Sequence, residues 1–180
     1  EKEIYIKKMK KFILKKSEII LCAKFRKGHF EGVLDVMNRL LYFIKCKHVY
    51  MGEKDYQQLS LIKKILGKKY NINIVGCPTI RDKYKVALST RNKLLNKSSI
   101  KKVSKLTLQL LKLKRKLTLN NLKMPINLLK TKSELEKIYK IKIEYLEFRD
   151  EKKLILNNFK FKCRLFIAYN INNVRLIDNF

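Results

Sequence analysis

The stretch of sequence that decides the fold runs from His48 to Cys77. It opens on His-Val-Tyr-Met-Gly, a short apolar run that ends in a glycine, and closes on Ile-Asn-Ile-Val-Gly-Cys, a second such run followed by Pro78. Both runs have the length and the β-branched or aromatic content of strands. Between them, residues 53–67 place apolar side chains at helical spacing. We therefore expect a buried strand at 48–51, a helix, and a second strand at 72–77.

The residues before this stretch continue the same alternation. Phe25 to Gly32 holds two glycines, so we expect a loop there, and from Val33 to Ile44 the apolar residues fall on one face of a helix. The order helix, strand, helix, strand is typical of an α/β domain with a parallel sheet. The apolar pieces at 11–14 and 18–22 do not distinguish helix from strand.

The character of the chain changes after residue 79, where we place a domain boundary. Residues 80–95 are charged and loop-like, and the rest predicts a small α+β domain over 80–180. Ser133, with Glu136 three residues later, has the pattern of a helix N-cap. The expected elements are helices at 98–117 and 131–140, strands at 141–148, 161–169 and 173–178, and a tight turn at 170–173.

Composition sets broad limits on the class of protein. The 180 residues carry a formal net charge of +29, which by default suggests a nucleic-acid or membrane-surface partner. The excess is scattered lysine in a chain also rich in Asn and Ile, whose codons are A/T-rich, and the arginine forks of phosphate-binding surfaces are sparse. Genomic drift is therefore the simpler explanation, and nucleic acid is an unlikely partner.

Cysteines and hydropathy place the chain in a reducing compartment without a membrane span. The four cysteines form no C-x-x-C pair and no zinc-type spacing, so we expect reduced thiols and no metal site built by the protein alone. No apolar run approaches the roughly 18 residues that a bilayer requires. We expect a cytoplasmic protein.

Gly52-Glu53-Lys54-Asp55 is the first candidate for chemistry. A glycine at the end of a strand lets a ligand approach the backbone, and the start of the next helix favours anions. Lys54 adds a cation at the same place, and Gln58 follows it at i+4 on the same face. A phosphate corner is one interpretation, and a plain strand–turn–helix corner with solvated charges is the simpler one on spacing alone.

Two further segments have the same ambiguity. Ser89 and Thr90 present adjacent hydroxyls before Arg91, a set that could hold triphosphate oxygens or could be an ordinary polar loop. Arg26 and His29 flank a glycine in a segment where a lone histidine is more often structural than catalytic.

Taken together, these segments resemble the pantothenate synthetases. Gly52 to Gln58 matches that family's G-E-K-D-[FY]-Q-Q, and the other matches keep their order and spacing along the chain. They are Lys2 to Tyr5 for K-E-I-Y, Arg26 to Gly32 for R-P-G-H-F-x-G, Ile74 to Pro78 with Arg81 for I-V-x-x-P-x-x-R, Leu88 to Asn92 for [ML]-S-S-R-N, and Val174 to Asn179 for V-R-L-I-D-N.

The resemblance implies an ATP-dependent, AMP-forming ligase of pantothenate biosynthesis. In this family pantoate attacks the α-phosphate of ATP, and β-alanine then attacks the resulting pantoyl adenylate, with Mg²⁺ bridging the phosphates. The fold implied is the C-terminal part of a Rossmann-like nucleotidyltransferase domain over 1–79, followed by the small α+β domain. Family members are commonly homodimers.

The resemblance also assigns roles to residues. Gly52 to Asp55 would line the ATP site, with Lys54 on phosphate, and Gln58 would bind pantoate. Ile80 would meet the nucleotide through its backbone. Leu88, Ser89, Thr90 and Arg91 would form a loop that closes on the triphosphate, which makes Lys54 and Arg91 the catalytic candidates. Arg26 and His29 would lie near pantoate and β-alanine.

Four positions depart from the family pattern. Thr90 replaces a second serine but keeps a hydroxyl, and Lys27 replaces a proline. Tyr84-Lys85 stands where the family has an Asp-Gly turn, so a residue with easy access to positive φ is missing from the approach to the loop.

The family's H-x-G-H motif has no counterpart in this chain, whose histidines are His29 and His48. The sequence also begins with Glu rather than Met. We therefore expect an N-terminal part to be missing and these residues alone to be inactive and marginally folded. A basic nucleic-acid-binding module and a decayed remnant without activity are the alternatives.

Overall fold

The computed structural model describes residues 5, 9–119, 127–156 and 162–180. The chain divides into two compact units, Glu1–Pro78 and Thr79–Phe180. Every helix in the described ranges is too short or too polar to cross a bilayer. All four cysteines lie in those ranges, and none forms a disulfide.

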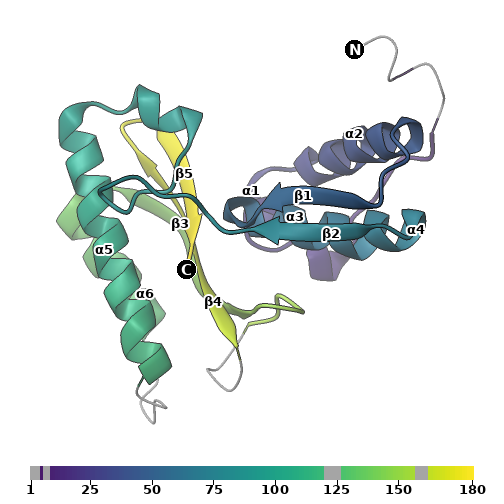
Figure 1. Ribbon diagram of the computed structural model, residues 1–180. Helices are drawn as coiled ribbons and strands as arrows, with labels where there is room; N and C mark the ends of the chain where they lie inside the picture. The colour runs from purple at the N-terminus through teal and green to yellow at the C-terminus, as the bar shows by residue number, and fades with distance from the viewer. Residues whose placement is uncertain (1–4, 6–8, 120–126, 157–161) are drawn as a thin grey trace. The chain divides into compact units, whose positions relative to one another are not determined.

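The first unit is built on two parallel strands, β1 (His48–Gly52) and β2 (Asn73–Cys77) (Figure 1). They pair in register from His48 opposite Asn73 to Gly52 opposite Cys77. The crossover between them is helical throughout and comprises η3 (Glu53–Asp55), α3 (Tyr56–Ile62), the π-helical turn η4 (Lys63–Gly67) and α4 (Lys68–Tyr70). The predicted strand–helix–strand order and parallel sheet are confirmed.

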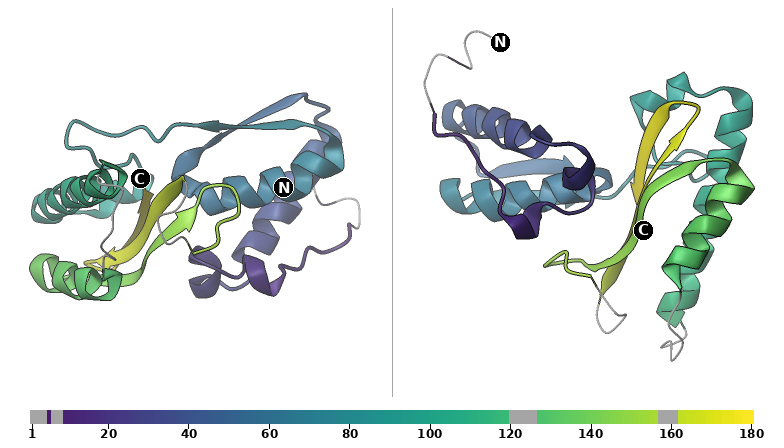
Figure 2. Two further views of the ribbon diagram at one scale, coloured as in Figure 1. Left: turned by 90° about the horizontal axis from the view of Figure 1, so that it is seen from below. Right: turned by 180° about the vertical axis from the view of Figure 1, so that it is seen from behind.

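The helices of the first unit cover one face of this sheet. Before β1 come η2 (Lys16–Glu18), α1 (Cys22–Phe25) and α2 (His29–Phe43), and Figures 1 and 2 show α2 and α3 together on the same side of the strands. Side chains from α2, α3, η4 and β2 form the buried core, among them Leu34, Ile62, Leu66 and Ile74.

Because the helices cover only one face of the sheet, β1 is not a buried strand. The prediction of a buried strand at 48–51 is therefore wrong. Val49 and Met51 are half-buried, but His48 and Tyr50 are exposed, and Tyr50 keeps 70% of its surface. Period-two alternation sends every second side chain to the face opposite the helices. The apolar run in the sequence predicted the strand, but it did not indicate which face of the strand the helices cover.

The helix before β1 begins four residues earlier than predicted. Gly28 occupies the left-handed region at φ 77 and serves as the N-cap of α2, so His29 is the first helical residue. A glycine is needed there because an L-residue with a side chain disfavours that conformation. The prediction of a loop through Gly32 is therefore wrong in its second half, where Gly32 lies inside the helix.

The second unit is a three-stranded antiparallel sheet with two helices. The sheet order is β3 (Lys142–Asp150), β4 (Cys163–Ile171), β5 (Val174–Asn179), and α5 (Lys97–Leu119) and α6 (Leu128–Tyr139) pack together on it (Figures 1 and 2). The core joins alternate residues of β4 to the apolar stripes of both helices and includes Leu106, Leu110, Leu135, Leu165 and Ile167. The predicted α+β arrangement is confirmed.

Two details of the second unit test the sequence predictions. The hairpin turn lies at Asn172 and Asn173, both with positive φ of 47 and 62, within the predicted turn at 170–173. The helix N-cap at Ser133 is wrong, because α6 begins at Leu128 and its cap is Asn127, whose side chain accepts a hydrogen bond from Lys130 N at 3.0 Å. Glu136 instead accepts from the backbone of Ile143 at 2.7 Å. Residue 161, the expected start of a strand, lies outside the described ranges.

Candidate functional site

The first candidate group lies where β1 ends. Gly52 has an ordinary extended backbone (φ −66, ψ 131), and a side chain added there would meet nothing within 4 Å. Open space, rather than an unusual φ, is thus what this glycine supplies. The chain turns at once into η3, where Glu53 and Lys54 are half-buried and Asp55 is exposed. The corner combines an accessible backbone with a cation and two carboxylates.

Lys54 and Gln58 lie four residues apart in the continuous helical run that begins at Glu53. Both are half-buried. Gln57 is buried instead, and its amide nitrogen donates to the carbonyl oxygens of Glu18 at 3.2 Å and Ile20 at 2.8 Å. Sequence reasoning gave Gln57 no role, yet it fixes the segment before α1 onto the start of α3.

A buried carboxylate reinforces this connection. Glu18 accepts hydrogen bonds from Lys64 Nζ at 2.7 Å and from the backbone of Lys15 at 2.9 Å. Burial raises the pKa of Glu18, but these two contacts outweigh it and hold the pKa below its ordinary value. The carboxylate therefore stays ionised and ties residues 15–18 to the helical crossover.

Gly76 of β2 makes room for the corner. It lies opposite Met51 in the parallel pair, and a Cβ built on it would stand 3.0 Å from Glu53 Oε1 and 3.1 Å from Leu59 Cδ2. A side chain there would push on the first acidic residue of η3 and on the helix that follows. Gly76 falls at an unspecified position of the motif that the sequence matches, so only the structure reveals this contact.

The Arg26–His29 turn lies at the same end of the sheet. Because α2 runs antiparallel to β1, its N-terminus and α1 lie beside the carboxyl ends of the strands (Figure 1). The turn is closed by a hydrogen bond from His29 N to Arg26 O at 3.2 Å, and both side chains are half-buried. The first unit thus brings two of the predicted segments to one edge, the edge at which open α/β sheets bind ligands.

The other candidate residues belong to the second unit, in the loop between β2 and α5. Ile80 is 68% exposed and its carbonyl accepts from Leu88 N at 3.0 Å, so this backbone is pinned while the side chain faces solvent. Ser89 caps the short helix η5 (Thr90–Leu94), with its hydroxyl oxygen accepting from Arg91 N at 3.2 Å. The Ser89 O–H remains able to donate.

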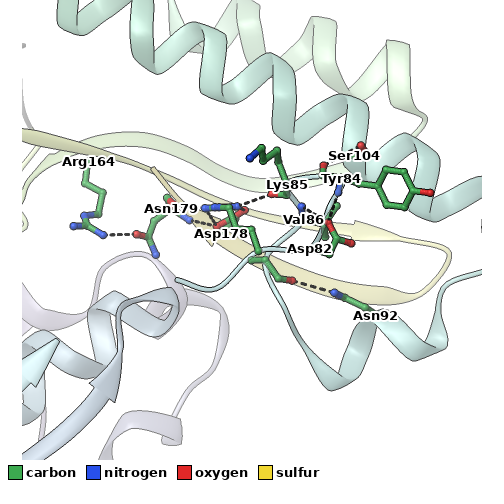
Figure 3. A network of polar contacts seen from close by, with 11 residues as sticks. Asp82, Tyr84, Lys85, Val86, Asn92, Ser104, Arg164, Asp178 and Asn179 are labelled. Carbon is green, nitrogen blue, oxygen red and sulfur yellow. Dashed lines mark hydrogen bonds and ion pairs between the residues drawn. The ribbon is translucent and has the colours of Figure 1, made fainter. Parts of the chain in front are cut away.

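The turn that leads into this loop keeps a left-handed residue without a glycine. Lys85 has φ 66, and its N–H donates to Asp82 O at 2.9 Å (Figure 3). The Asp82 carboxylate accepts from the backbone of Tyr84 at 2.8 Å and of Val86 at 2.9 Å. The sequence lacks a glycine at this turn, yet the backbone still forms the turn. Lys85 adopts the left-handed conformation there, at a steric cost.

No trio of His, Cys, Asp or Glu side chains in the described ranges is placed to hold a metal ion. The K-E-I-Y resemblance falls mainly on residues 2–4, outside those ranges.

Comparison with known proteins identifies the family. The family model of pantoate-beta-alanine ligase matches residues 1–180. The pantothenate synthetase of Flavobacterium psychrophilum is 32% identical over 166 residues, covering 90% of this chain and 58% of that protein. That of Leptospira interrogans (serovar copenhageni) is 38% identical over 162 residues, covering 88% and 56%.

Solved structures agree with the sequence matches. The pantoate-beta-alanine ligase of Francisella tularensis, in a complex with beta-gamma ATP and beta-alanine, aligns with a TM-score of 0.72 at 34% identity, covering 96% of this chain and 58% of that one. The pantothenate synthetase of Thermus thermophilus aligns with a TM-score of 0.73, covering 99% and 66%, and at 23% identity it shows the fold alone.

The fold is that of the pantothenate synthetases, with the α/β class and Rossmann-like parallel portion that the resemblance implied. The chain belongs to the pantoate-beta-alanine ligase family. It spans 56–58% of the length of the curated relatives named above. A nucleic-acid module and a decayed remnant are not favoured by these matches.

Proposed function

We propose that the protein that carries this chain uses ATP to condense pantoate with β-alanine, giving pantothenate. The observation that carries the proposal is the strand-end corner Gly52–Gln58 beside the Arg26–His29 turn, in a chain that the ligase family model matches over residues 1–180. Residues 1–79 would serve as part of the nucleotide-binding domain, and residues 80–180 would supply the closing loop.

The corner supplies the chemistry that a nucleotide requires. Gly52 to Asp55 would line the ATP site, where the open backbone at Gly52 admits a phosphate and Lys54 neutralises its charge. Gln58, on the same helical face, would hydrogen-bond pantoate. Arg26 and His29, at the same edge, would face pantoate and β-alanine.

The loop of the second unit would supply the remaining contacts to ATP. The Ile80 backbone would meet the nucleotide, and Leu88 to Arg91 would close on the triphosphate. The Ser89 hydroxyl, the exposed Thr90 and the exposed Arg91 guanidinium offer donors for phosphate oxygens. Because Thr90 keeps a hydroxyl in place of the family's serine, the change is expected to be mild.

The reaction would proceed in two steps. A pantoate carboxylate oxygen attacks the α-phosphorus and pyrophosphate leaves, giving pantoyl adenylate. The β-alanine amine then attacks the acyl carbon, an amide bond forms, AMP leaves, and the amine loses a proton. Lys54 and Arg91 would stabilise charge on the phosphates during the first step.

Mg²⁺ would enter on the triphosphate as part of the substrate. Magnesium typically keeps several waters and binds through substrate phosphates and one or two carboxylates. Glu53 and Asp55 at the corner fit such a role. We further propose a homodimer in the cytoplasm, where reduced cysteines of the kind found here persist.

The test is AMP formation by the protein expressed from its complete reading frame. AMP should appear only when ATP, pantoate and β-alanine are all present. Lys54→Ala should lower kcat/KM by about 10²-fold or more. Lys68→Ala is the matched control, since it removes the same charge from an exposed site at the far end of the helical crossover. Equal loss in both variants would contradict the assignment of Lys54.

The adenylate intermediate has its own assay. Labelled pyrophosphate should exchange into ATP in the presence of pantoate alone. Exchange that requires β-alanine would contradict the two-step order.

A further inference from the structure

The base of the loop that carries Ser89 to Arg91 is clamped to β5 by one arginine. Arg81 Nη1 lies 2.7 Å from Asp178 Oδ2, and Arg81 Nη2 lies 2.9 Å from Asp178 Oδ1, so the pair is bidentate. Figure 3 labels the acceptor residues Asp178 and Asn179. Arg81 Nη2 also donates to Asn179 O at 3.0 Å, and the guanidinium stands 4.8 Å from the centre of the Phe180 ring. Asp178 is buried, so water competes little for these bonds.

The same guanidinium also holds the loop's own turn. Arg81 Nη1 donates to Lys85 O at 3.0 Å, the carbonyl of the residue in the left-handed conformation. Arg81 and Ala87 form an isolated antiparallel bridge directly before Leu88. Arg81 therefore connects β5 and the turn through its side chain, and the approach to Ser89 through its backbone.

The contact at the tip of the loop is much weaker. Arg91 Nη1 reaches Arg175 O on β5 at 3.4 Å, at the limit of a hydrogen bond and in an exposed place. Arg175 itself is held by Glu144 of β3, with contacts of 2.7–3.0 Å. The anchor on β5 is thus rigid, whereas Arg91 can leave it at little cost.

We propose that Arg81 and Asp178 are positioning residues that hold the base of the loop at residues 80–91 against β5, so that Ser89, Thr90 and Arg91 are presented to the triphosphate. This inference rests on the proposed function. In this proposal the two residues act through the loop and not on the substrate itself. The clamp fixes the base of the loop while Arg91 stays free to exchange a weak backbone contact for a phosphate.

The variants that test it are Asp178→Asn and Arg81→Lys, which alter the bidentate pair with little change in volume. The matched control is Glu147→Gln, which weakens another partly buried ion pair of the same unit, Arg149 Nη2 to Glu147 Oε2 at 2.5 Å on β3. The hydrogen bonds of that pair do not involve the loop at 80–92.

The first readout is amide hydrogen exchange in the whole protein, which needs no activity. Asp178→Asn and Arg81→Lys should speed exchange in residues 82–91 by about tenfold or more, while the strands β3 and β4 keep their protection. Glu147→Gln should leave residues 82–91 unchanged. Unchanged exchange in the first two variants, or an equal change in the control, would overturn the clamp.

The second readout is the kinetic split. Both clamp variants should raise the KM for ATP in pantoate-dependent AMP formation, so that kcat/KM for ATP falls about 10²-fold. The KM for β-alanine should stay within about twofold. Equal loss for all three substrates would indicate general damage and overturn the positioning role. A wild-type protein without pantoate-dependent AMP formation would instead refute the proposed function, while exchange in the variants would still decide the clamp.

Discussion

Lys85 is a residue whose substitution should stabilise the second unit through the backbone alone. It is exposed and has φ 66 in the turn that leads to the proposed nucleotide loop. An L-residue in the left-handed region costs about 1–2 kcal/mol relative to its preferred conformations. Glycine is the residue that adopts this conformation without a steric cost.

The expected gain follows from two opposing terms. Glycine at position 85 removes the steric cost, but its freer unfolded chain loses about 0.5–1 kcal/mol more entropy on folding. The comparison with Lys85→Ala isolates these terms, because both variants remove the charge and the long side chain. Lys85→Gly should therefore be more stable than Lys85→Ala by about 0.5–1 kcal/mol, or about 2–5 °C in Tm for a unit of this size.

The assay is thermal and urea unfolding followed by circular dichroism, with Lys101 as the internal control. Lys101 is exposed inside α5, where Ala should be more stable than Gly by about 1 kcal/mol. The sign of the Ala-to-Gly change must therefore reverse between the two positions. If Gly is less stable than Ala at both, Lys85 carries no left-handed strain and the account of this turn is wrong.

Three further predictions concern other contacts. In urea unfolding, Gly76→Ala should destabilise the first unit by about 1–3 kcal/mol, because an added Cβ would crowd Glu53 and Leu59. Gly32→Ala should stabilise the same unit by up to about 1 kcal/mol, because Gly32 lies inside α2 with open space around it. Glu18 has a lowered pKa in the folded state, so its contribution is full above the ordinary glutamate pKa and is lost as the pH falls below it. In urea unfolding measured across acidic pH, Glu18→Gln should reduce the dependence of the free energy of unfolding on pH. Lys64→Met should reduce it in part. Asn127→Ala should cost about 1 kcal/mol through loss of the α6 cap, and no change would contradict its assignment.

Local patterns were sufficient to predict most elements. Short apolar runs located β1 and β2, and helical spacing located α3. The helix between two strands implied their parallel pairing, because such a crossover is what brings parallel strands together. The paired asparagines at 172 and 173 sit at the positive φ values that a tight hairpin requires.

The features that were missed depend on contacts between distant residues. The exposed face of β1 depends on which face the helices cover, and the space at Gly76 depends on Glu53 in the neighbouring element. Arg81 and Asp178 are 97 positions apart, so no local pattern could pair them. Ser133 had the pattern of an N-cap, but α6 begins earlier in the chain, at Leu128, and Asn127 is its N-cap.

The most direct test of the central claim is the pantoate- and β-alanine-dependent release of AMP by the protein from its complete reading frame, with Lys54→Ala compared with Lys68→Ala. We predict substrate-dependent AMP release that Lys54→Ala lowers by about 10²-fold and Lys68→Ala leaves unchanged. AMP release that does not depend on pantoate, or that is indifferent to Lys54, would contradict the assignment of the Gly52–Asp55 corner to ATP.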